Sequence, residues 1–260
     1  MRTDRIGGAV FDNKGLPNLH YNQGTQRAIA NKLVKNPSSR DVSAFLSKAK
    51  AIQSVQSRQT KLMFALDATA SREPTWASAK KLHRDLFNAG IEGTNLAIQL
   101  CYYRGLGEFQ YSPWLTNPHE LLAHMEEVVC LGGPTQLERM LRHYLGQRSG
   151  LAPVKALVFV GDAVEESYDA LAALAGECGL YKLPLFIFQE GQDPEAKSAF
   201  TMLARRSGGA YASFDHNSAD RLRELLGAVV RFTAGGIKAL TQSGLESDKL
   251  LLGQLRLGKD

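Results

Sequence analysis

The chain has 260 residues, of which 44% are hydrophobic and 22% are charged, enough apolar material for one sizeable α/β core with extensions. No run reaches eighteen apolar residues and no apolar stretch follows the first five residues, so neither a membrane span nor a secretory signal is expected. Three widely spaced cysteines (Cys101, Cys130, Cys178) fit neither a disulfide framework nor a cysteine zinc site, which favours a reducing, cytoplasmic setting.

The net charge of +5 is concentrated near the N-terminus. Residues 1–61 hold 11 Lys and Arg against three acidic residues, which leaves 20 of the 31 basic and 23 of the 26 acidic residues for the rest of the chain. A basic arm can contact an acidic partner, although a solvated surface explains the same composition. Nucleic-acid binding is not expected, because the arm has no dense Lys/Arg block and no interleaved aromatic residues.

Residues 1–60 are expected to form a basic extension that precedes the main domain. Residues 1–25 are rich in Gly, Asn and Pro and predict an irregular segment, followed by a short helix over 26–34. Apolar residues recur at helical spacing between Val42 and Ile52, which predicts an amphipathic helix. Such a helix must cover an apolar surface, most simply a flank of the domain that follows.

Strands alternate with helices from residue 61 to residue 233. The predicted strands cover residues 62–66, 95–103, 107–111, 156–160, 183–188 and 210–214. The predicted helices cover residues 74–88, 117–129, 136–145, 165–177, 195–206 and 218–230. This alternation is typical of parallel βαβ units in an open, doubly wound sheet, where ligands bind beyond the carboxyl ends of the strands. Residues 234–260 are expected to form a C-terminal tail with a leucine-rich end.

Oxygen-bearing side chains follow two strand ends and one turn. Asp67 ends the first strand, and the spacing of Thr69 and Ser71 can aim both hydroxyls the same way. Thr135 follows a Gly-Gly-Pro turn, and Asp162 ends the strand ALVFV. Because Mg²⁺ favours oxygen ligands and uses only one or two carboxylates, this set predicts a divalent-cation site. One coordination position would be left for an acidic group from a partner.

The order Asp-x-Thr-x-Ser, then Gly-Gly-Pro-Thr, then an apolar strand ending in Gly-Asp resembles the von Willebrand factor A (VWA) domain family and its metal-ion-dependent adhesion site (MIDAS). The resemblance covers roughly residues 60–232 and matches Asp67, Thr69, Ser71, Thr135 and Asp162 to the family's ligands. It implies a mostly parallel six-stranded sheet, VWA- or Rossmann-like, with a short antiparallel edge strand and helices on both faces. It also implies Mg²⁺ or Mn²⁺ at the top of the sheet.

Two departures from the family pattern concern the shape of the site. Thr69 stands where the family has serine, which keeps the hydroxyl but adds a methyl group close to the ion. Gly161 stands where the family often has a threonine directly before the last aspartate, and Ala163 stands where it often has a glycine directly after that aspartate. The alternative interpretation is that Asp67 and Asp162 cap helices while the hydroxyls form turn hydrogen bonds.

Glu165 and Glu166 follow closely on the last predicted ligand and have two interpretations. They would tune the charge of the cation site, or they would form the acidic first turn of the helix predicted over 165–177, which is the more common role of such a pair.

The resemblance implies a cytoplasmic, bacterial interaction module. Such a module acts as an adaptor that recruits an Asp or Glu carboxylate of a protein partner. Some domains of this family act in complexes that contain ATPases. Catalysis is not expected, because no nucleophile–base pair lies near the predicted ligands. The alternative is a metal-dependent phosphoester or nucleotide hydrolase, although the chain has no phosphate-binding P-loop. A third possibility is a metal-free domain held to an acidic partner by its basic arm.

Overall fold

A computed structural model describes residues 42–48, 50, 59–74, 76, 80, 95–150, 152–215 and 219–257. The chain divides into two compact units, Met1–Ala51 and Ile52–Asp260. In the first unit residues 42–48 are helical, as predicted. The helix predicted over 26–34 lies outside the described residues, and the idea that the amphipathic helix covers a flank of the domain stays a prediction.

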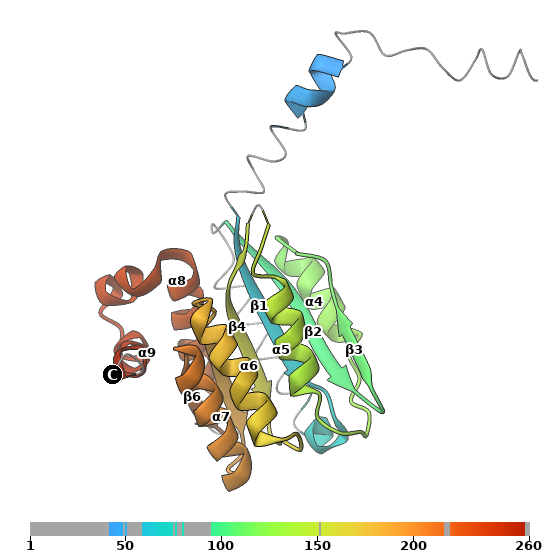
Figure 1. The fold of residues 1–260 in the computed structure, drawn as a ribbon, viewed down its shortest axis with the longest axis vertical. Coiled ribbons are helices and arrows are strands. Elements are labelled where there is room, and N and C mark those ends of the chain that lie inside the picture. The colour runs from blue at the N-terminus through green and yellow to red at the C-terminus, as the bar shows by residue number, and fades with distance from the viewer. Residues whose placement is uncertain are drawn as a thin grey trace, which may run out of the picture. The chain divides into compact units, whose positions relative to one another are not determined.

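Six strands of the second unit form one sheet in the order β3-β2-β1-β4-β5-β6 (Figure 1). The strands are β1 (Thr60–Asp67), β2 (Leu96–Arg104), β3 (Glu108–Tyr111), β4 (Val154–Gly161), β5 (Leu185–Glu190) and β6 (Ala210–Phe214). Neighbouring strands are parallel except β2 and β3, which are antiparallel. The prediction of a mostly parallel sheet with a short antiparallel edge strand is therefore confirmed.

Helices cover both faces of the sheet (Figure 1). The helices α5 (Leu137–Gly146), α6 (Tyr168–Leu180) and α7 (Pro194–Ser207) pack on one face, and α4 (Pro118–Glu126) and α8 (Ala219–Ser243) pack on the other. Side chains of β1 alternate between the two cores, and both cores bury them, which explains the continuous apolar run of this strand. No helix in the described part of the chain is long and apolar enough to cross a membrane.

The residues predicted as a C-terminal tail are helical and pack on the domain. Helix α8 continues to Ser243, bending at Gly236 (φ 64°, ψ −159°), and α9 (Glu246–Leu257) follows. Positive φ suits glycine, because it has no Cβ. Buried leucines from this region join the core that contains β1: Leu240, Leu251, Leu252 and Leu255. The leucine-rich end is therefore part of the second unit.

Some helix boundaries differ from the predictions. Helix α6 begins at Tyr168 instead of residue 165, which leaves Glu165 and Glu166 in the preceding loop. Helix α4 ends at Glu126 instead of residue 129. Residues 73, 74, 76 and 80 are helical, which agrees with the helix predicted over 74–88, and the remainder of that helix lies outside the described residues.

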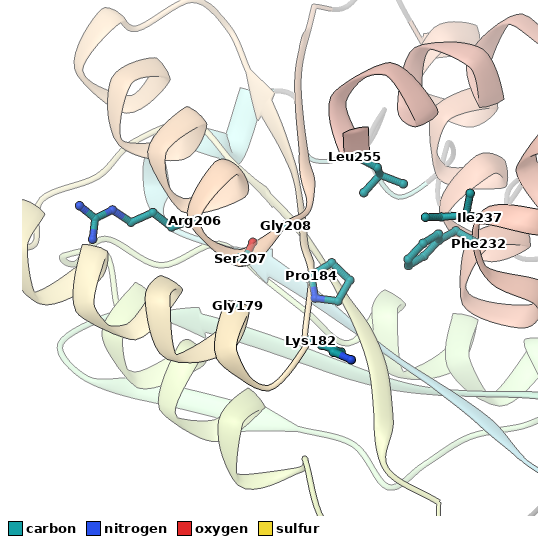
Figure 2. A pocket seen from close by; sticks show the side chains of 9 residues that line it. All are labelled: Gly179, Lys182, Pro184, Arg206, Ser207, Gly208, Phe232, Ile237 and Leu255. Atoms are coloured by element: carbon teal, nitrogen blue, oxygen red, sulfur yellow. The ribbon is translucent and has the colours of Figure 1, made fainter. Parts of the chain in front are cut away.

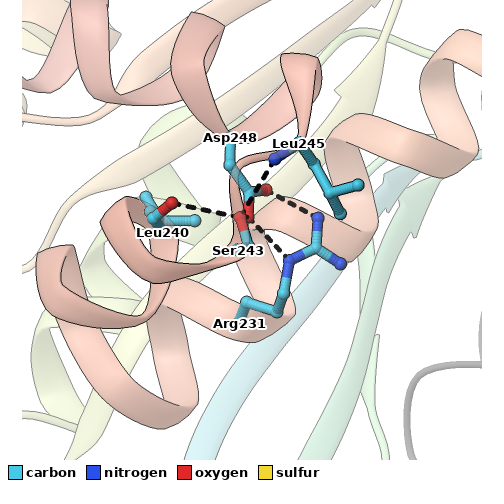
Figure 3. Close-up of polar contacts among 5 residues, drawn as sticks. All are labelled: Arg231, Leu240, Ser243, Leu245 and Asp248. Atoms are coloured by element: carbon cyan, nitrogen blue, oxygen red, sulfur yellow. Dashed lines mark hydrogen bonds and ion pairs between the residues drawn. The ribbon is translucent and has the colours of Figure 1, made fainter.

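An ion pair between a partly exposed arginine of α8 and a buried carboxylate of α9 joins the two helices (Figure 3). Asp248 is fully buried, and its carboxylate accepts two hydrogen bonds from Arg231, from Nη2 at 2.6 Å and from Nε at 2.9 Å. Ser243 Oγ also donates to Asp248. Burial of Asp248 opposes its ionisation, but the hydrogen bonds from Arg231 and Ser243 outweigh this effect and hold the pKa of Asp248 below its ordinary value. The ion pair therefore ties α9 to the part of α8 that precedes the bend at Gly236.

A pocket of about 450 Å³ lies at the amino ends of β5 and β6 (Figure 2), opposite to the edge where Asp67 ends β1. Its lining is mostly apolar side chains and helix-end backbone: Gly179, Lys182, Pro184, Arg206, Ser207, Gly208, Phe232, Ile237 and Leu255. Figure 2 shows the Arg206 side chain pointing away from Phe232 and Leu255. The pocket contains none of the predicted site residues.

We expect Asp248→Asn to lower the free energy of unfolding at neutral pH by about 1.5–3 kcal/mol, the contribution typical of hydrogen bonds to charged groups. The pKa of Asp248 is lower in the folded than in the unfolded chain. Its stabilisation is therefore complete above the unfolded pKa of about 3.9 and is lost as pH falls through the folded pKa. Urea denaturation at neutral pH and at about pH 3 should show the cost shrinking in acid. Glu246→Gln, which removes an exposed acid of the same helix, is the control, and equal losses in both variants would contradict the account.

Candidate metal centre

Parallel pairing brings the predicted site residues to one edge of the sheet. Asp67 ends β1 opposite Tyr103 of β2, and on the other side Leu66 pairs with Val160 of β4. Asp162 follows directly after β4. Because β1 is central, Asp67 is fully buried at this edge.

The loop after β1 turns its two hydroxyl groups toward each other. The backbone N–H of Thr69 donates to Asp67 Oδ1 at 2.8 Å, and Thr69 Oγ1 lies 3.1 Å from Ser71 Oγ. A short 3₁₀ helix, η1 (Ala70–Arg72), holds this arrangement. The spacing of two therefore brings the two hydroxyls within hydrogen-bond distance of each other, and their role as ligands stays a prediction. The Asp67–Thr69 bond is the kind of turn bond that the alternative interpretation expects.

Close packing of two glycines positions the loop that leads to Thr135. A Cβ atom on Gly133 would overlap the carbonyl group of Gly105, so only glycine fits there. The backbone of Leu131 also bridges the loops, since its N–H donates to Ala68 O and its carbonyl accepts from Gly105 N–H, both at 3.0 Å. Thr135 is thereby held beside the loop that carries Thr69 and Ser71.

Glu165 and Glu166 reach across to this loop instead of starting α6. Thr135 Oγ1 donates to Glu166 and accepts from the Glu165 N–H at 2.9 Å, and the Thr135 N–H donates to Glu165 Oε2 at 3.2 Å. The other carboxylate oxygen of Glu166 accepts from the N–H of Leu137, in the first turn of α5. The interpretation as the acidic first turn of α6 is therefore wrong, because these carboxylates bond to the start of a different helix.

Gly161 departs from the family pattern for a steric reason. A Cβ atom at this position would lie 2.5 Å from the ring of Phe159 and 3.2 Å from the Cβ of Asp67. The aromatic core under the site thus takes the space that a threonine side chain would need. Asp162 follows, and its Oδ1 is a buried oxygen with no hydrogen-bond partner among the described residues. Asp162 does not cap α6, whose N-cap is Ser167.

The electrostatics of the edge favour a cation. Burial raises the pKa of Asp67, and the carboxylate of Asp162 raises it further, while hydrogen bonds from Thr69 and the charge of Arg72 act in the opposite direction. Arg72 is itself buried and forms an ion pair with Glu190 at 2.9 Å. Its charge is therefore shared with a carboxylate outside the predicted site.

The chemistry of the donor set fits a hard divalent cation. Within the described ranges no group of three His, Cys, Asp or Glu side chains is arranged to hold a metal. The predicted ligands are of a different kind, since they comprise only two carboxylates together with three hydroxyls. The proton of Thr135 Oγ1 goes to Glu166 and one lone pair accepts the Glu165 N–H, which leaves one lone pair for a ligand. The open Oδ1 of Asp162 is a second available donor. Mg²⁺ and Mn²⁺ suit such oxygen donors.

Two further residues of the site were not identified from the sequence. The Tyr103 hydroxyl donates to Asp67 Oδ2 at 3.0 Å, and Arg72 contributes a buried guanidinium. Tyr103 could have been identified from its place at the end of the predicted strand 95–103. Parallel alignment of that strand with strand 62–66 sets Tyr103 opposite Asp67. Nothing local marked Arg72, whose partner Glu190 ends a strand more than a hundred residues later.

Comparison with known proteins identifies the fold. No family model and no curated protein sequence matches the chain. An aerotolerance-related membrane protein from Bacteroides fragilis is similar in structure, with a TM-score of 0.53, 14% identity, and coverage of 66% of this chain and 98% of that one. The SpRpn10 VWA domain gives a TM-score of 0.50 at 14% identity, covering 60% and 88%. A von Willebrand factor type A protein from Catenulispora acidiphila gives 0.50 at 14%, covering 66% and 43%.

The chain has the fold of a VWA domain. At this identity the similarity establishes the fold alone. The five predicted ligands of the VWA-like unit stay predictions that rest on the donor chemistry described above.

We expect Gly133→Ala to destabilise the VWA fold by about 1–3 kcal/mol, the usual cost of forcing extra atoms into a packed position. The methyl group would push the loop away from Gly105 and displace Thr135. Gly132→Ala is the matched control, since its Cβ would meet only Ala70 at an ordinary 3.8 Å. Thermal unfolding of both variants tests this, and equal melting temperatures would contradict the packing argument.

Asp67→Asn is expected to stabilise the metal-free protein while removing its response to a cation. The substitution removes a buried charge next to Asp162, which should raise the free energy of unfolding in EDTA by roughly 0.5–2 kcal/mol, as is common when a strained functional residue is replaced. Added Mn²⁺ should raise the melting temperature of the wild type but not of the variant. A lower melting temperature of Asp67→Asn in EDTA would show that the carboxylate itself stabilises the fold.

Proposed function

We propose that this chain is a non-catalytic protein-interaction domain. Asp67, Thr69, Ser71, Thr135 and Asp162 would hold Mg²⁺ or Mn²⁺, and the ion would recruit an Asp or Glu carboxylate of a protein partner. The observation that carries the proposal is the pair of neighbouring carboxylates, Asp67 and Asp162, at a hydroxyl-lined edge where burial disfavours the charge of Asp67 and Oδ1 of Asp162 has no hydrogen-bond partner among the described residues. A divalent cation relieves that cost and supplies the charge that attracts an acidic group.

Exposed apolar side chains around the same edge support a protein as the partner. Leu106 is 94% exposed in the turn between β2 and β3, and Val129 and Leu131 are more than half exposed in the loop leading to Thr135. The backbone bonds of Leu131 to Ala68 and Gly105 hold this loop against the loop that carries Thr69 and Ser71. Large exposed apolar groups next to a polar centre are typical of interaction surfaces.

The hydrolase alternative receives less support from the same residues. Transfer of a phosphate group needs cationic side chains that stabilise its charge. Arg72, the cation that acts on Asp67, is fully buried and already pairs with Glu190. The fold neighbours include VWA domains, which agrees with an interaction role. The cytoplasmic setting, the bacterial origin and an ATPase-containing partner complex stay predictions.

Calorimetric titration of Mn²⁺ and Mg²⁺ tests the metal assignment. Wild type should bind one ion, and Asp162→Ala should weaken binding at least about tenfold, because a ligand and a compensating charge are lost. Glu246→Gln, which removes an exposed acid on α9, should bind as wild type does. Equal heats in wild type and Asp162→Ala would overturn the assignment.

Fluorescence polarisation with short peptides tests the partner chemistry. The probes carry one Asp or Glu between apolar residues, and the control peptides carry Asn or Gln instead. Binding should require Mn²⁺ and the carboxylate together, and EDTA should abolish it. Binding of the amide peptides with the same Kd would exclude a carboxylate as the group that is recognised.

A further inference from the structure

Tyr103 contacts the carboxylate at the centre of the proposed metal site. Its hydroxyl donates to Asp67 Oδ2 at 3.0 Å, while the N–H of Thr69 donates to Asp67 Oδ1 at 2.8 Å. Both oxygens of the Asp67 carboxylate therefore accept hydrogen bonds from the protein, and the Thr69 side chain also contributes to holding the group. Because a carboxylate has about four lone-pair positions, at least one remains for an ion or for water bound to it.

The surroundings of Tyr103 make it a rigid donor. Its side chain is 1% exposed, and its ring stacks on Phe159 with centroids 6.2 Å apart and an angle of 21° between the planes. Its backbone pairs with Phe109 of β3 and accepts a hydrogen bond from Ala68 N–H at 3.0 Å. The residue is thus held by both neighbouring strands and by the core below.

The phenol is also held neutral. Burial raises the pKa of Tyr103 well above its ordinary value, and the nearby charges of Asp67, Glu166 and Asp162 act in the same direction. The donor role itself rests on the 3.0 Å contact between the Tyr103 hydroxyl and Asp67 Oδ2.

We propose that Tyr103 is a positioning residue for the cation site, whose hydroxyl fixes the orientation of the Asp67 carboxylate toward the bound ion. This inference rests on the proposed function. The Tyr103–Asp67 contact resembles the outer-shell hydrogen bonds that orient metal ligands in other proteins, whose loss weakens metal affinity by about 10–100-fold. The hydrogen bond from Tyr103 would hold the Asp67 side chain in one rotamer before the ion binds. Binding of the ion would then not have to order this side chain.

A purely structural role predicts a different result. If the hydroxyl only satisfies a buried carboxylate, its loss lowers stability and leaves the affinity for an ion unchanged. A positioning role changes the dissociation constant for the ion, whatever the effect on stability. The two roles are therefore separated by measuring Mn²⁺ affinity and metal-free stability on the same variants.

The experiment compares wild type, Tyr103→Phe and Tyr144→Phe by calorimetric titration of Mn²⁺ and by thermal unfolding in EDTA. Tyr144 is the matched control, since it is also fully buried and its hydroxyl donates to Pro184 O at 3.3 Å, outside the proposed site. Tyr103→Phe keeps the ring that packs on Phe159, so the variant should fold.

We expect Tyr103→Phe to raise the Mn²⁺ Kd by about tenfold or more, and Tyr144→Phe to leave it unchanged. A wild-type Kd in Tyr103→Phe would overturn the positioning role alone. An equal rise of the Kd in both variants would also overturn it, because the effect would then follow from general loosening of the core. If the wild type itself takes up no Mn²⁺, the proposed function fails and this inference fails with it.

Discussion

The pairing of β1 with β2 on one side and β4 on the other is the constraint on which the candidate site depends. Parallel strands end at the same edge of a sheet, so the central position of β1 brings Asp67, Tyr103 and Asp162 together from segments far apart in the chain. Both faces of β1 are buried by helices, which keeps the strand from shifting by one residue. A shift of that size would turn the Asp67 side chain to the other face.

The central position of β1 also has an energetic consequence, because it buries the carboxylate of Asp67 at this edge. Asp67 is fully buried beside Asp162, and this cost is only partly offset by Thr69, Tyr103 and Arg72. Carboxylates whose pKa is perturbed by burial and by a neighbouring charge are concentrated at functional sites. The hydroxyl groups and the open oxygen of Asp162 at the same edge are donors of the kind that a hard cation prefers, which is why the proposed function assigns a cation to this edge. Two exposed leucines, Leu106 and Leu131, lie near the same edge. Exposed apolar side chains of this kind are common where a protein partner binds.

Local patterns in the sequence were sufficient for the sheet but not for the loops. Apolar runs such as 62–66 predict buried strands correctly, since both faces of a parallel sheet exclude water. The start of α6 was misplaced because Glu165 and Glu166 have the composition of a first helical turn, yet their carboxylates bond to Thr135 and Leu137 about thirty residues earlier. The helical C-terminus was missed for a similar reason, since the packing of its leucines and the Arg231–Asp248 pair are contacts between distant segments. Contacts of this kind have no local signal.

The anomalous difference map of a crystal grown with MnCl₂ tests the central claim most directly. The proposed site predicts a single strong peak at the carboxyl edge of the sheet, among the side-chain oxygen atoms of Asp67, Thr69, Ser71, Thr135 and Asp162. Its shell should be completed by water or by a carboxylate from a neighbouring molecule. A map with no peak at this edge, or with manganese bound only elsewhere on the protein, would contradict the account.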